Sequence, residues 1–398
     1  MSSQVQELLD GVNTGRWLLP SPDLPNPISL ARAISGICGG RYDWNDPVAD
    51  QLRAMIGEPE HLVFVIADGF GMNFVNTLPE DSFVRRHLAV EGRAAFPPIT
   101  AANLFALGQG EWPGQHAAIG WYMLLAEIGE RATVFPWIRT RDGEDLTVLG
   151  VTAESVYPRQ SLAPQFNRDS MSLVPDELSM SNPSKALHGS TCAGYESPAS
   201  AIDTAINRAA YSHWTYTHIY WPMIDKSSHE YGTEDEKTCQ LVSELDAEMQ
   251  RLRSGLPEDS RLVVIADHGH LNIREDQKFL IAPDDPLTKL LTSDVSGDTK
   301  TAIFHVKEGA KEAFAQQFRE KFGDHFFLFS AQEVAELELF GPDGITDFTA
   351  GRLGDFIAVA KGQEAIKFQT PENTREISQF SEHGGLTPDE MLVPIVIA

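Results

Sequence analysis

The sequence is poor in cysteine. Its 398 residues include three cysteines, Cys38, Cys192 and Cys239, and no two of them form a C-x-x-C pair. This spacing argues against a disulfide framework and against a zinc knuckle, and it fits a reducing cytoplasm. We therefore expect a cytoplasmic protein.

Positive charge is also scarce. The chain has 31 Lys and Arg residues against 57 Asp and Glu residues, and its formal net charge is −26. Such an excess of negative charge works against sequence-independent binding to a phosphate backbone or to an anionic membrane surface. We therefore predict no nucleic-acid partner and no membrane partner, and we expect any bound phosphate to be held locally by metal.

Long apolar runs are missing as well. The longest strongly apolar run beside a motif, residues 62–67, is far shorter than the roughly 20 residues that a membrane helix needs. The first thirty residues contain no apolar core behind a basic start, so no secretory signal is predicted. The chain carries no signal for an oligomeric state.

Three short apolar segments, by contrast, have the character of buried strands. Residues 62–67 and 262–266 are continuous β-branched runs closed by Asp-Gly and Asp-His-Gly, and residues 216–221 lead within a few positions to Asp225. Continuous apolar runs of this length are typical of parallel sheets that are covered on both faces. The sequence thus predicts an α/β fold with a mostly parallel central sheet flanked by helices.

Residues 301–329 form a separate pattern. A strand at 301–306 is followed by a helix with Phe314, Phe318 and Phe322 on one face, and then by a strand at 326–329. We interpret this unit as a small inserted α+β cap. A further stretch, about 123–200, is rich in Pro, Ser and Gly, and we expect long loops there. The predicted domains are a catalytic core of residues 1–295 and 341–398 and a cap of residues 296–340.

Carboxylates and imidazoles stand at the ends of these strands and in a glycine-rich tail. Oxygen and nitrogen ligands in four separate segments suggest two divalent metal ions, since such an ion commonly takes three protein ligands and keeps an open position. Taken singly, Asp68 could instead be a helix N-cap, and Asp225 with His229 could be a solvated pair on a helix face. The candidate metal ligands are Asp68, Asp225, His229, Asp267, His268 and His383.

The candidate nucleophile is Thr100. It follows Pro97 and Pro98, and a helix starting at Ala101 would direct free N–H groups toward an anion beside the Thr100 hydroxyl. The alternative is that Thr100 is an N-cap, a role that threonine fills well. A threonine hydroxyl needs a metal or a base to become nucleophilic, so the nearby ligand set favours the first interpretation.

Five motifs occur in order: VIADGFG, FPPITAAN, DKSSHEYG, ADHG and SEHGGLTPDEMLVPIV. Together, from about residue 60 to the end, they resemble the alkaline phosphatase superfamily, and within it the type I phosphodiesterase and nucleotide pyrophosphatase group. The resemblance implies an alkaline phosphatase-like core with two divalent metal ions, typically zinc, although manganese or iron would also suit Asp and His ligands. It implies that Asp68, Thr100, Asp267 and His268 surround one metal and that Asp225, His229 and His383 hold the other.

The resemblance also implies a two-step reaction. Thr100 would attack phosphorus to form a phosphothreonine, which water would then hydrolyse, with retention of configuration at phosphorus. The predicted function is hydrolysis of a small-molecule phosphate ester as a phosphodiesterase or nucleotide pyrophosphatase. Alternatives are a phosphomonoesterase or phosphonate hydrolase on the same site, or a non-catalytic metal-binding relative.

One position departs from the family pattern. Trp121 stands where the nucleotide pyrophosphatases that we compare place a phosphoryl-binding asparagine. Two interpretations are open: Trp121 lines a leaving-group pocket with Tyr122, or it packs beneath the loops. Asn103 is too close to Thr100 in sequence to be a direct substitute. The candidate substrate-binding residues are Asn103, Trp121 and Tyr122, while His270 is expected at the surface beside the site.

Overall fold

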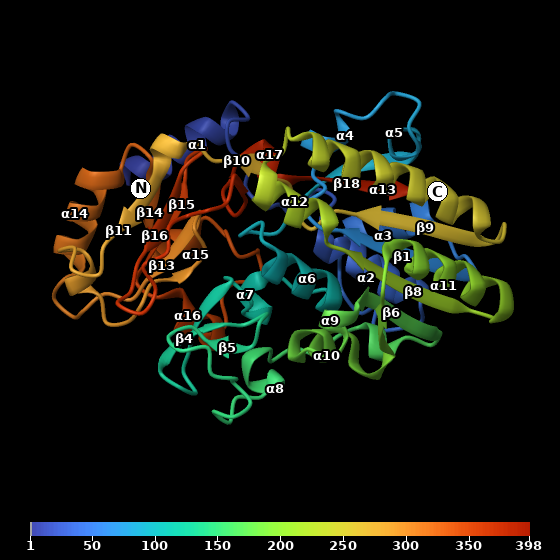
Figure 1. The fold of residues 1–398 in the computed structure, drawn as a ribbon, viewed down its shortest axis with the longest axis horizontal. Helices are drawn as coiled ribbons and strands as arrows, with labels where there is room; N and C mark the ends of the chain where they lie inside the picture. The colour runs from blue at the N-terminus through green and yellow to red at the C-terminus, as the bar shows by residue number, and fades with distance from the viewer. Residues whose placement is uncertain (1) are drawn as a thin grey trace.

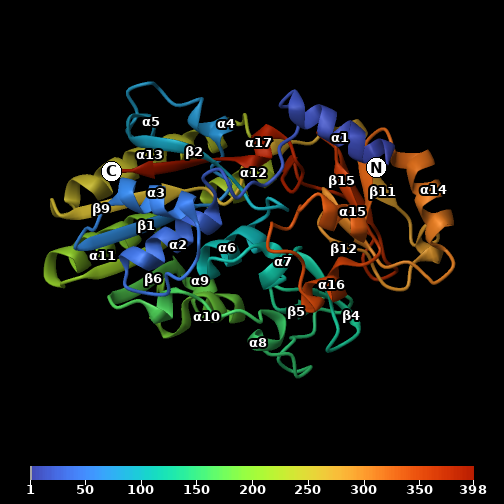
Figure 2. The same cartoon turned by 180° about the vertical axis from the view of Figure 1, so that it is seen from behind.

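The centre of the molecule is a seven-stranded sheet, whose strands lie one above another in Figures 1 and 2; the computed structural model describes residues 2–398. Its strands are β1 His61–Ala67, β2 Leu88–Arg93, β6 Asp169–Pro175, β7 Cys192–Tyr195, β8 Thr215–Trp221, β9 Ser260–Ile265 and β18 Leu392–Ile397. Their order is β2-β18-β9-β1-β8-β6-β7. Neighbours are parallel except at β18, which runs antiparallel to both β9 and β2. The predicted α/β core with a mostly parallel sheet is confirmed.

Helices cover both faces of this sheet, which explains why its central strands are buried along their whole length. Every residue of β1 and β8 is buried. Figure 1 shows α11 and α13 in front of the sheet. Figure 2, the view from the opposite side, shows α2 and α3 in front of the other face. The flanking helices are α2 Pro27–Ile37, α3 Pro47–Ile56, α6 Thr100–Gln109, α11 Pro198–Tyr211, α12 Met223–Tyr231 and α13 Glu236–Gly255.

Several of these helices begin at a local start signal in the sequence. Asn26, Asp46 and Ser197 each accept a hydrogen bond from the first turn of α2, α3 and α11, and a proline follows each of them at the first helical position. A proline there loses no hydrogen bond, because that N–H has no partner inside the helix. Asp235 caps α13 in the same way through its side chain.

A second sheet lies beside the first and is antiparallel throughout. Its strands are β3 Tyr122–Leu125, β4 Glu130–Thr133, β5 Ile138–Arg139, β12 Ser296–Gly297, β13 Thr301–Phe304, β14 Phe326–Ser330 and β15 Phe356–Ala360. Their order is β14-β15-β13-β12-β3-β4-β5. Helix α14 (Lys311–Phe322) packs its buried phenylalanines with Phe304 of this sheet, and Trp17 packs edge-on against Phe327 with ring centroids 4.8 Å apart.

The second sheet takes in more of the chain than the segment predicted as a cap. The strand, helix and strand expected within 296–340 are present as β13, α14 and β14, but β15 and the hairpin strands β3 to β5 come from outside that segment. The long loops expected at 123–200 are a wrong prediction. That stretch supplies strands to both sheets, because short strands shielded by neighbouring segments need no long periodic pattern.

Shorter elements connect these layers. The helices are α1 Ser3–Asn13, α4 Met72–Val75, α5 Phe83–His87, α7 Pro113–His116, α8 Ala153–Val156, α9 Asp176–Ser179, α10 Asn182–His188, α15 Ala331–Glu336, α16 Asp347–Leu353 and α17 Pro388–Met391. The 3-10 turns are η1 Ala163–Gln165, η2 Gly189–Thr191, η3 Glu275–Gln277 and η4 Thr288–Leu290. Two small pairs are antiparallel β10 Leu271–Asn272 with β17 Ser381–Glu382, and parallel β11 Lys278–Ile281 with β16 Ala365–Phe368.

Two sequence-level exclusions can be compared with the fold. Cys38, Cys192 and Cys239 are all unpaired, as their spacing predicts. Within residues 2–398, no helix has both the length and the apolar character that crossing a membrane requires.

A fully buried ion pair joins the two sheets near the carboxyl terminus. Lys300 Nζ lies 3.0 Å from Glu390 Oε1, and both side chains are completely buried. Glu390 also accepts hydrogen bonds from the Gly385 N–H at 2.8 Å and from the Thr387 hydroxyl at 2.6 Å. The pair therefore fixes the glycine-rich turn that follows His383.

Neutralising one partner should destabilise the protein strongly. We expect Glu390→Gln to lower the free energy of unfolding by about 3–5 kcal/mol, because the Lys300 charge stays buried without its counter-ion. Urea denaturation followed by circular dichroism measures this change. The double variant Lys300→Met/Glu390→Gln should recover part of the lost free energy of unfolding. If Glu390→Gln lowers the free energy of unfolding by only the roughly 0–1 kcal/mol typical of a surface ion pair, the buried pair does not have this role.

Candidate metal centre and active site

The chain's polar residues meet at the carboxyl ends of the central strands. Asp68 follows β1, and Asp267 and His268 follow β9, the neighbour of β1 in the sheet. Ligand sites of open α/β sheets lie at this edge, where the strands deliver side chains to one crevice. Gly69 permits the tight turn after β1: its φ is +72°, and a Cβ there would come within 2.8 Å of the His270 ring.

Four residues form the first cluster, which we call site 1: Asp68, Thr100, Asp267 and His268. Three oxygens surround His268 Nε2, with Asp68 Oδ1 at 3.3 Å, Asp267 Oδ2 at 3.4 Å and Thr100 Oγ1 at 3.2 Å. The Nδ1–H of His268 donates to the Gly269 carbonyl at 3.1 Å. The ring therefore presents the Nε2 lone pair to these oxygens, as a metal-binding imidazole does.

The remaining carboxylate oxygens of site 1 are already bound. Asp267 Oδ1 accepts from the N–H groups of Gly69 and His268, both at 3.0 Å, and Asp68 Oδ2 accepts from the Tyr220 hydroxyl. Within residues 2–398, Asp68 Oδ1 and Asp267 Oδ2 are buried oxygens without a hydrogen-bond partner. Unpaired buried carboxylate oxygens are costly, so their convergence beside an imidazole lone pair fits a bound cation.

The electrostatics agree with this interpretation. Burial raises the pKa of Asp68 well above its ordinary value, and the neighbouring charges of Asp267 and Asp225 raise it further. Burial also raises the pKa of Asp267. A cation between these carboxylates would remove the repulsion and keep both ionised.

Thr100 is not the N-cap of its helix. Helix α6 begins at Thr100 itself, Ile99 occupies the cap position, and no side chain caps the helix. The Thr100 hydroxyl instead lies 3.2 Å from His268 Nε2. The start of α6 therefore leaves unbound N–H groups and the positive end of its dipole beside this hydroxyl.

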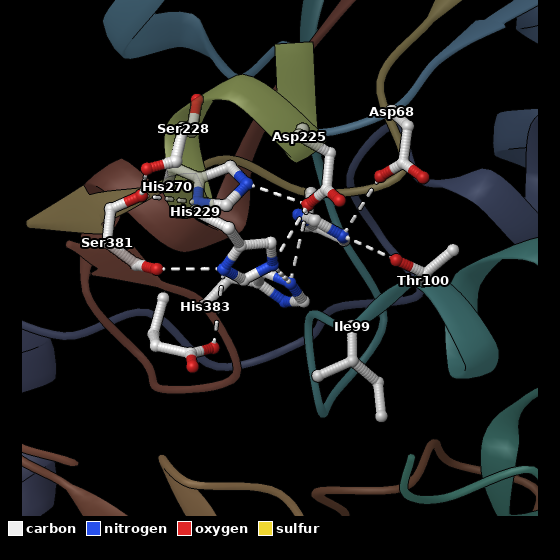
Figure 3. Close-up of polar contacts among 12 residues, drawn as sticks. Asp68, Ile99, Thr100, Asp225, Ser228, His229, His270, Ser381 and His383 are labelled. Atoms are coloured by element: carbon white, nitrogen blue, oxygen red, sulfur yellow. Dashed lines mark hydrogen bonds and ion pairs between the residues drawn. The ribbon is translucent and has the colours of Figure 1, made fainter. Parts of the chain in front are cut away.

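The second cluster, which we call site 2, comprises Asp225, His229, His270 and His383, whose nearest ligand atoms all lie within 4.8 Å of one another. Asp225 Oδ1 is 3.3 Å from His229 Nε2 and 3.6 Å from His383 Nε2, and the two Nε2 atoms are 3.2 Å apart. Asp225 and His229 are one turn apart on α12, which places both on the same helix face, as Figure 3 shows.

Hydrogen bonds from Nδ1 to backbone carbonyls fix the orientation of two histidine rings in site 2. His229 Nδ1 donates to the Ser381 carbonyl at 2.8 Å, and His383 Nδ1 donates to the Pro98 carbonyl at 3.0 Å. Because a carbonyl can only accept, both rings carry a hydrogen on Nδ1, and in their neutral forms their Nε2 lone pairs face each other. This arrangement fits a cation that accepts both lone pairs.

Site 2 also favours positive charge. Burial lowers the pKa of His229, but the carboxylates of Asp225 and Glu382 outweigh burial and raise it to about 10. Burial raises the pKa of Asp225, yet the charge and hydrogen bond of His229 bring it well below its ordinary value. Glu382 Oε2 lies 3.7 Å from His229 Nδ1, and sequence reasoning gave this glutamate no part in the site.

The two sites are adjacent. The rings of His268 in site 1 and His383 in site 2 are stacked, with centroids 3.7 Å apart and planes at 15°. Pairing of β17 with β10 brings the tail that carries His383 next to the segment after β9. The structure thus brings all seven predicted residues, from Asp68 to His383, into one contiguous cluster.

The prediction for His270 is wrong. Its residue is 1% exposed, and its Nε2 lies 2.8 Å from Asp225 Oδ1 inside site 2. A signal was present in the sequence, since His268 and His270 are two positions apart and alternate residues of an extended segment share a face. Tyr220, which donates to Asp68, was also missed, because a tyrosine at the end of a buried strand is usually part of the core.

The prediction for Asn103 is also contradicted. Its completely buried carboxamide accepts from the Ala95 N–H at 2.8 Å and donates to the carbonyls of Ala95, Pro97 and Ile99 at 3.2–3.3 Å. These bonds leave it no free group for a substrate. Asn103 instead braces the loop that leads to Thr100.

Tyr122 begins β3 of the second sheet, and Trp121 immediately precedes it. Trp121 is half-buried and stacks on Phe135 with ring centroids 5.8 Å apart, and Phe135 packs against the start of α6. Tyr122 lines a pocket together with Arg131, Asp298 and Lys367, and the Arg131 guanidinium lies 5.0 Å from the Tyr122 ring centroid.

Comparisons with known proteins extend this description. The sequence pattern of the family described as type I phosphodiesterase / nucleotide pyrophosphatase matches residues 62–385. No curated protein matches the chain.

Similar solved structures include murine ectonucleotide pyrophosphatase/phosphodiesterase 5 as an inactive threonine-to-alanine variant in complex with AMP. It is 15% identical, with 85% of this chain and 87% of that chain covered and a TM-score of 0.59. A second structure of the murine protein and a structure of the human protein are also 15% identical to this chain. In both cases 84% of this chain and 87% of the other chain are covered, and the TM-scores are 0.57 and 0.59. At this identity the likeness shows a shared fold.

Proposed function

The chain belongs to the type I phosphodiesterase / nucleotide pyrophosphatase family of the alkaline phosphatase superfamily, and we propose that it hydrolyses small-molecule phosphodiesters with Thr100 as nucleophile. The family consists of metal-dependent hydrolases that act on phosphoric esters. The observation that carries the proposal is the position of the Thr100 hydroxyl among the unpaired oxygens and the imidazole of site 1.

The surroundings of Thr100 support its role. Its hydroxyl stands at the start of α6, where free N–H groups and the helix dipole would stabilise negative charge on a bound phosphoryl group. Asn103 holds the preceding loop rigidly, so the hydroxyl is positioned before substrate binds. A structurally similar protein was made inactive by a threonine-to-alanine exchange, which accords with this assignment.

We further propose two divalent cations, one in each site. Site 1 offers two carboxylate oxygens, one imidazole and the Thr100 hydroxyl, and site 2 offers a carboxylate and imidazoles. Zinc suits these ligands best, with manganese or iron as alternatives. When bound, the cations would supply charge stabilisation for the attacking and leaving oxygens and would lower the pKa of nearby hydroxyl groups.

The protein's part in the reaction is then as follows. Thr100 Oγ1 gives its proton to solvent water and forms a bond to phosphorus as the bond from phosphorus to the leaving oxygen breaks, which gives a phosphothreonine and releases the leaving alcohol. In the second step a water oxygen bonds to phosphorus, the bond to Thr100 Oγ1 breaks, and a water proton returns to Oγ1, so that a phosphate monoester leaves and threonine is restored. Each in-line step inverts the configuration at phosphorus, so the two steps together retain it.

Substrate preference rests on the second sheet. Half-buried Trp121 and Tyr122 offer aromatic surface beside the start of α6, which favours a diester with an aryl or nucleoside group. One observation favours phosphomonoesters or phosphonates as a second candidate: Arg131 and Lys367 line the pocket next to Tyr122 and could pair with additional negative charge.

Rates on matched substrates test the proposal. We expect the zinc-loaded protein to hydrolyse bis(p-nitrophenyl) phosphate with a kcat/KM at least about ten-fold above that for p-nitrophenyl phosphate, a difference of about 1.4 kcal/mol in transition-state binding. A phosphonate monoester serves as the third substrate. Faster monoester or phosphonate turnover would favour the second candidate, and no turnover of any substrate by protein that holds both cations would indicate a non-catalytic relative.

A cytoplasmic location is part of the proposal. It is supported by the three unpaired cysteines, of which Cys239 is exposed.

A further inference from the structure

His270 is the one residue of site 2 to which the family resemblance gives no role. Its side chain is completely buried, and its Nε2 approaches Asp225 Oδ1 more closely than either His229 or His383 does, at 2.8 Å against 3.3 and 3.6 Å. Figure 3 shows the His270 ring directed at Asp225 from the side of Ser381 and Ser228. His270 therefore already occupies the position of a ligand.

The hydrogen bonds around Ser381 define which nitrogen of His270 carries the hydrogen. The Ser381 hydroxyl donates to the Ser228 carbonyl at 2.8 Å, and a carbonyl can only accept. The Ser381 oxygen is then left with lone pairs toward His270 Nδ1, 3.1 Å away, so Nδ1–H is the donor in that contact. In a neutral ring, Nε2 consequently presents a lone pair to the carboxylate of Asp225.

A lone pair facing a carboxylate oxygen at 2.8 Å is repulsive unless a positive charge lies between them or beside them. The other three imidazoles of the two sites have the same arrangement, with Nδ1 bound to an oxygen and Nε2 directed into the crevice. This is the usual arrangement of metal-binding histidines, in which a second contact fixes the tautomer. His270 thus shares the chemistry of its neighbours.

The backbone around His270 holds the ring in place. The Asn73 side chain donates to the His270 carbonyl at 3.0 Å. Gly69 lies against the ring, where a Cβ would come within 2.9 Å of His270 Nε2 and 3.0 Å of the Asp225 Cα. The close approach therefore depends on the absence of a side chain at Gly69, and the ring cannot easily move away from Asp225.

We propose that His270 is a fourth protein ligand of the site 2 cation, through Nε2, so that one carboxylate and three imidazoles hold this ion. The inference rests on the proposed function, because it presumes a cation in site 2. Three imidazoles favour zinc or another late first-row transition metal over magnesium or calcium, which prefer oxygen ligands. Site 2 should consequently retain its ion more strongly than it would with Asp225, His229 and His383 alone.

Metal titration of the full-length apoprotein tests the role of His270. Zn²⁺ is titrated against a chromophoric chelator, and Co²⁺ absorption reports the donor set of each site. We expect wild type to bind two ions. In His270→Gln, the affinity for one ion should fall by more than the roughly 10–100-fold that is lost when only the hydrogen bond holding a metal ligand is removed. The Co²⁺ spectrum of that ion alone should change.

Two controls isolate the effect. Ser381→Ala removes the hydrogen bond between the Ser381 hydroxyl and His270 Nδ1. This variant should keep both ions and both Co²⁺ bands, and its metal affinity should fall by at most about 100-fold. His213→Ala removes an exposed histidine whose side chain is 90% exposed and should behave as wild type. His270→Asn is measured alongside, and circular dichroism of each apoprotein reports folding.

The outcomes separate this inference from the proposed function. If His270→Gln and His270→Asn bind both ions with the wild-type affinities and Co²⁺ spectrum, His270 is no ligand although the two-cation proposal stands. If folded wild-type protein binds no ion in site 2, both the cation proposal and this inference fail. Loss of one ion in both variants, with site 1 unchanged, supports the inference.

Discussion

Thr100→Ala is expected to lower kcat for an aryl phosphodiester by about 1,000-fold or more while both cations remain bound. The reason is that the Thr100 hydroxyl is the group that would bond to phosphorus, and it lies 3.2 Å from His268 Nε2 in site 1. Removing it leaves the carboxylates and imidazole of site 1 in place. Release of p-nitrophenolate measures turnover, and elemental analysis of the purified variant measures the metal content.

Two further variants make this test specific. Thr100→Ser retains a hydroxyl at the same position and should keep a substantial part of the activity, because its oxygen can form the same bond to phosphorus. Asn103→Ala removes the hydrogen bonds that hold the 95–99 loop but no group of site 1 itself. We expect it to lower the stability of the protein and to displace Thr100. Turnover by Thr100→Ala close to the wild-type rate would show that another group attacks phosphorus.

Removing the cations is expected to abolish turnover and to lower the stability of the fold. The orphaned oxygens of Asp68 and Asp267 lie buried near one imidazole nitrogen. Burial raises the pKa of both carboxyls, and the charge of Asp267 raises the pKa of Asp68 further. A bound ion relieves this repulsion in the folded state alone. At a free ion concentration about 1,000-fold above Kd, each site should contribute about 4 kcal/mol to the free energy of unfolding.

Thermal unfolding and turnover are measured before chelation, after it, and after Zn²⁺ is restored. We expect Tm to fall by several degrees on chelation, and we expect both Tm and activity to recover with zinc. Thr100→Ala is the matched control: it should show nearly the same fall in Tm, although it has no turnover to lose. A chelated protein that holds no metal yet keeps its turnover would contradict the two-cation proposal.

The central sheet could be predicted because its signals are local. The strands β1 and β9 contain continuous apolar runs, since helices cover both faces of the sheet, and these runs lead to Asp68 and Asp267. The final strand β18 runs antiparallel to its neighbours, which no local signal indicates. Direction depends on where the chain re-enters the sheet, between β2 and β9, and no residue of β18 encodes that.

The second sheet shows why the rest could not be predicted. Its strands β3 to β5 and β12 have two to four residues each and come from two distant stretches of the chain. Runs that short have no measurable period, and their pairing depends on contact with strands from 301–304 and 356–360. The sequence therefore indicated the strands and the helix around the phenylalanines of α14, but it gave no signal for the short strands that pair with them.

By itself, the sequence determined the α/β class, the family and the identity of seven polar residues, because strand runs and short motifs are written in consecutive positions. Tertiary structure alone decided that the two predicted ligand sets lie against each other, with the rings of His268 and His383 stacked, and it placed His270 inside the second set. It also turned Asn103 away from the substrate toward its own loop. These outcomes depend on which hydrogen-bond partners approach from segments far apart in the chain, and local sequence does not specify that approach.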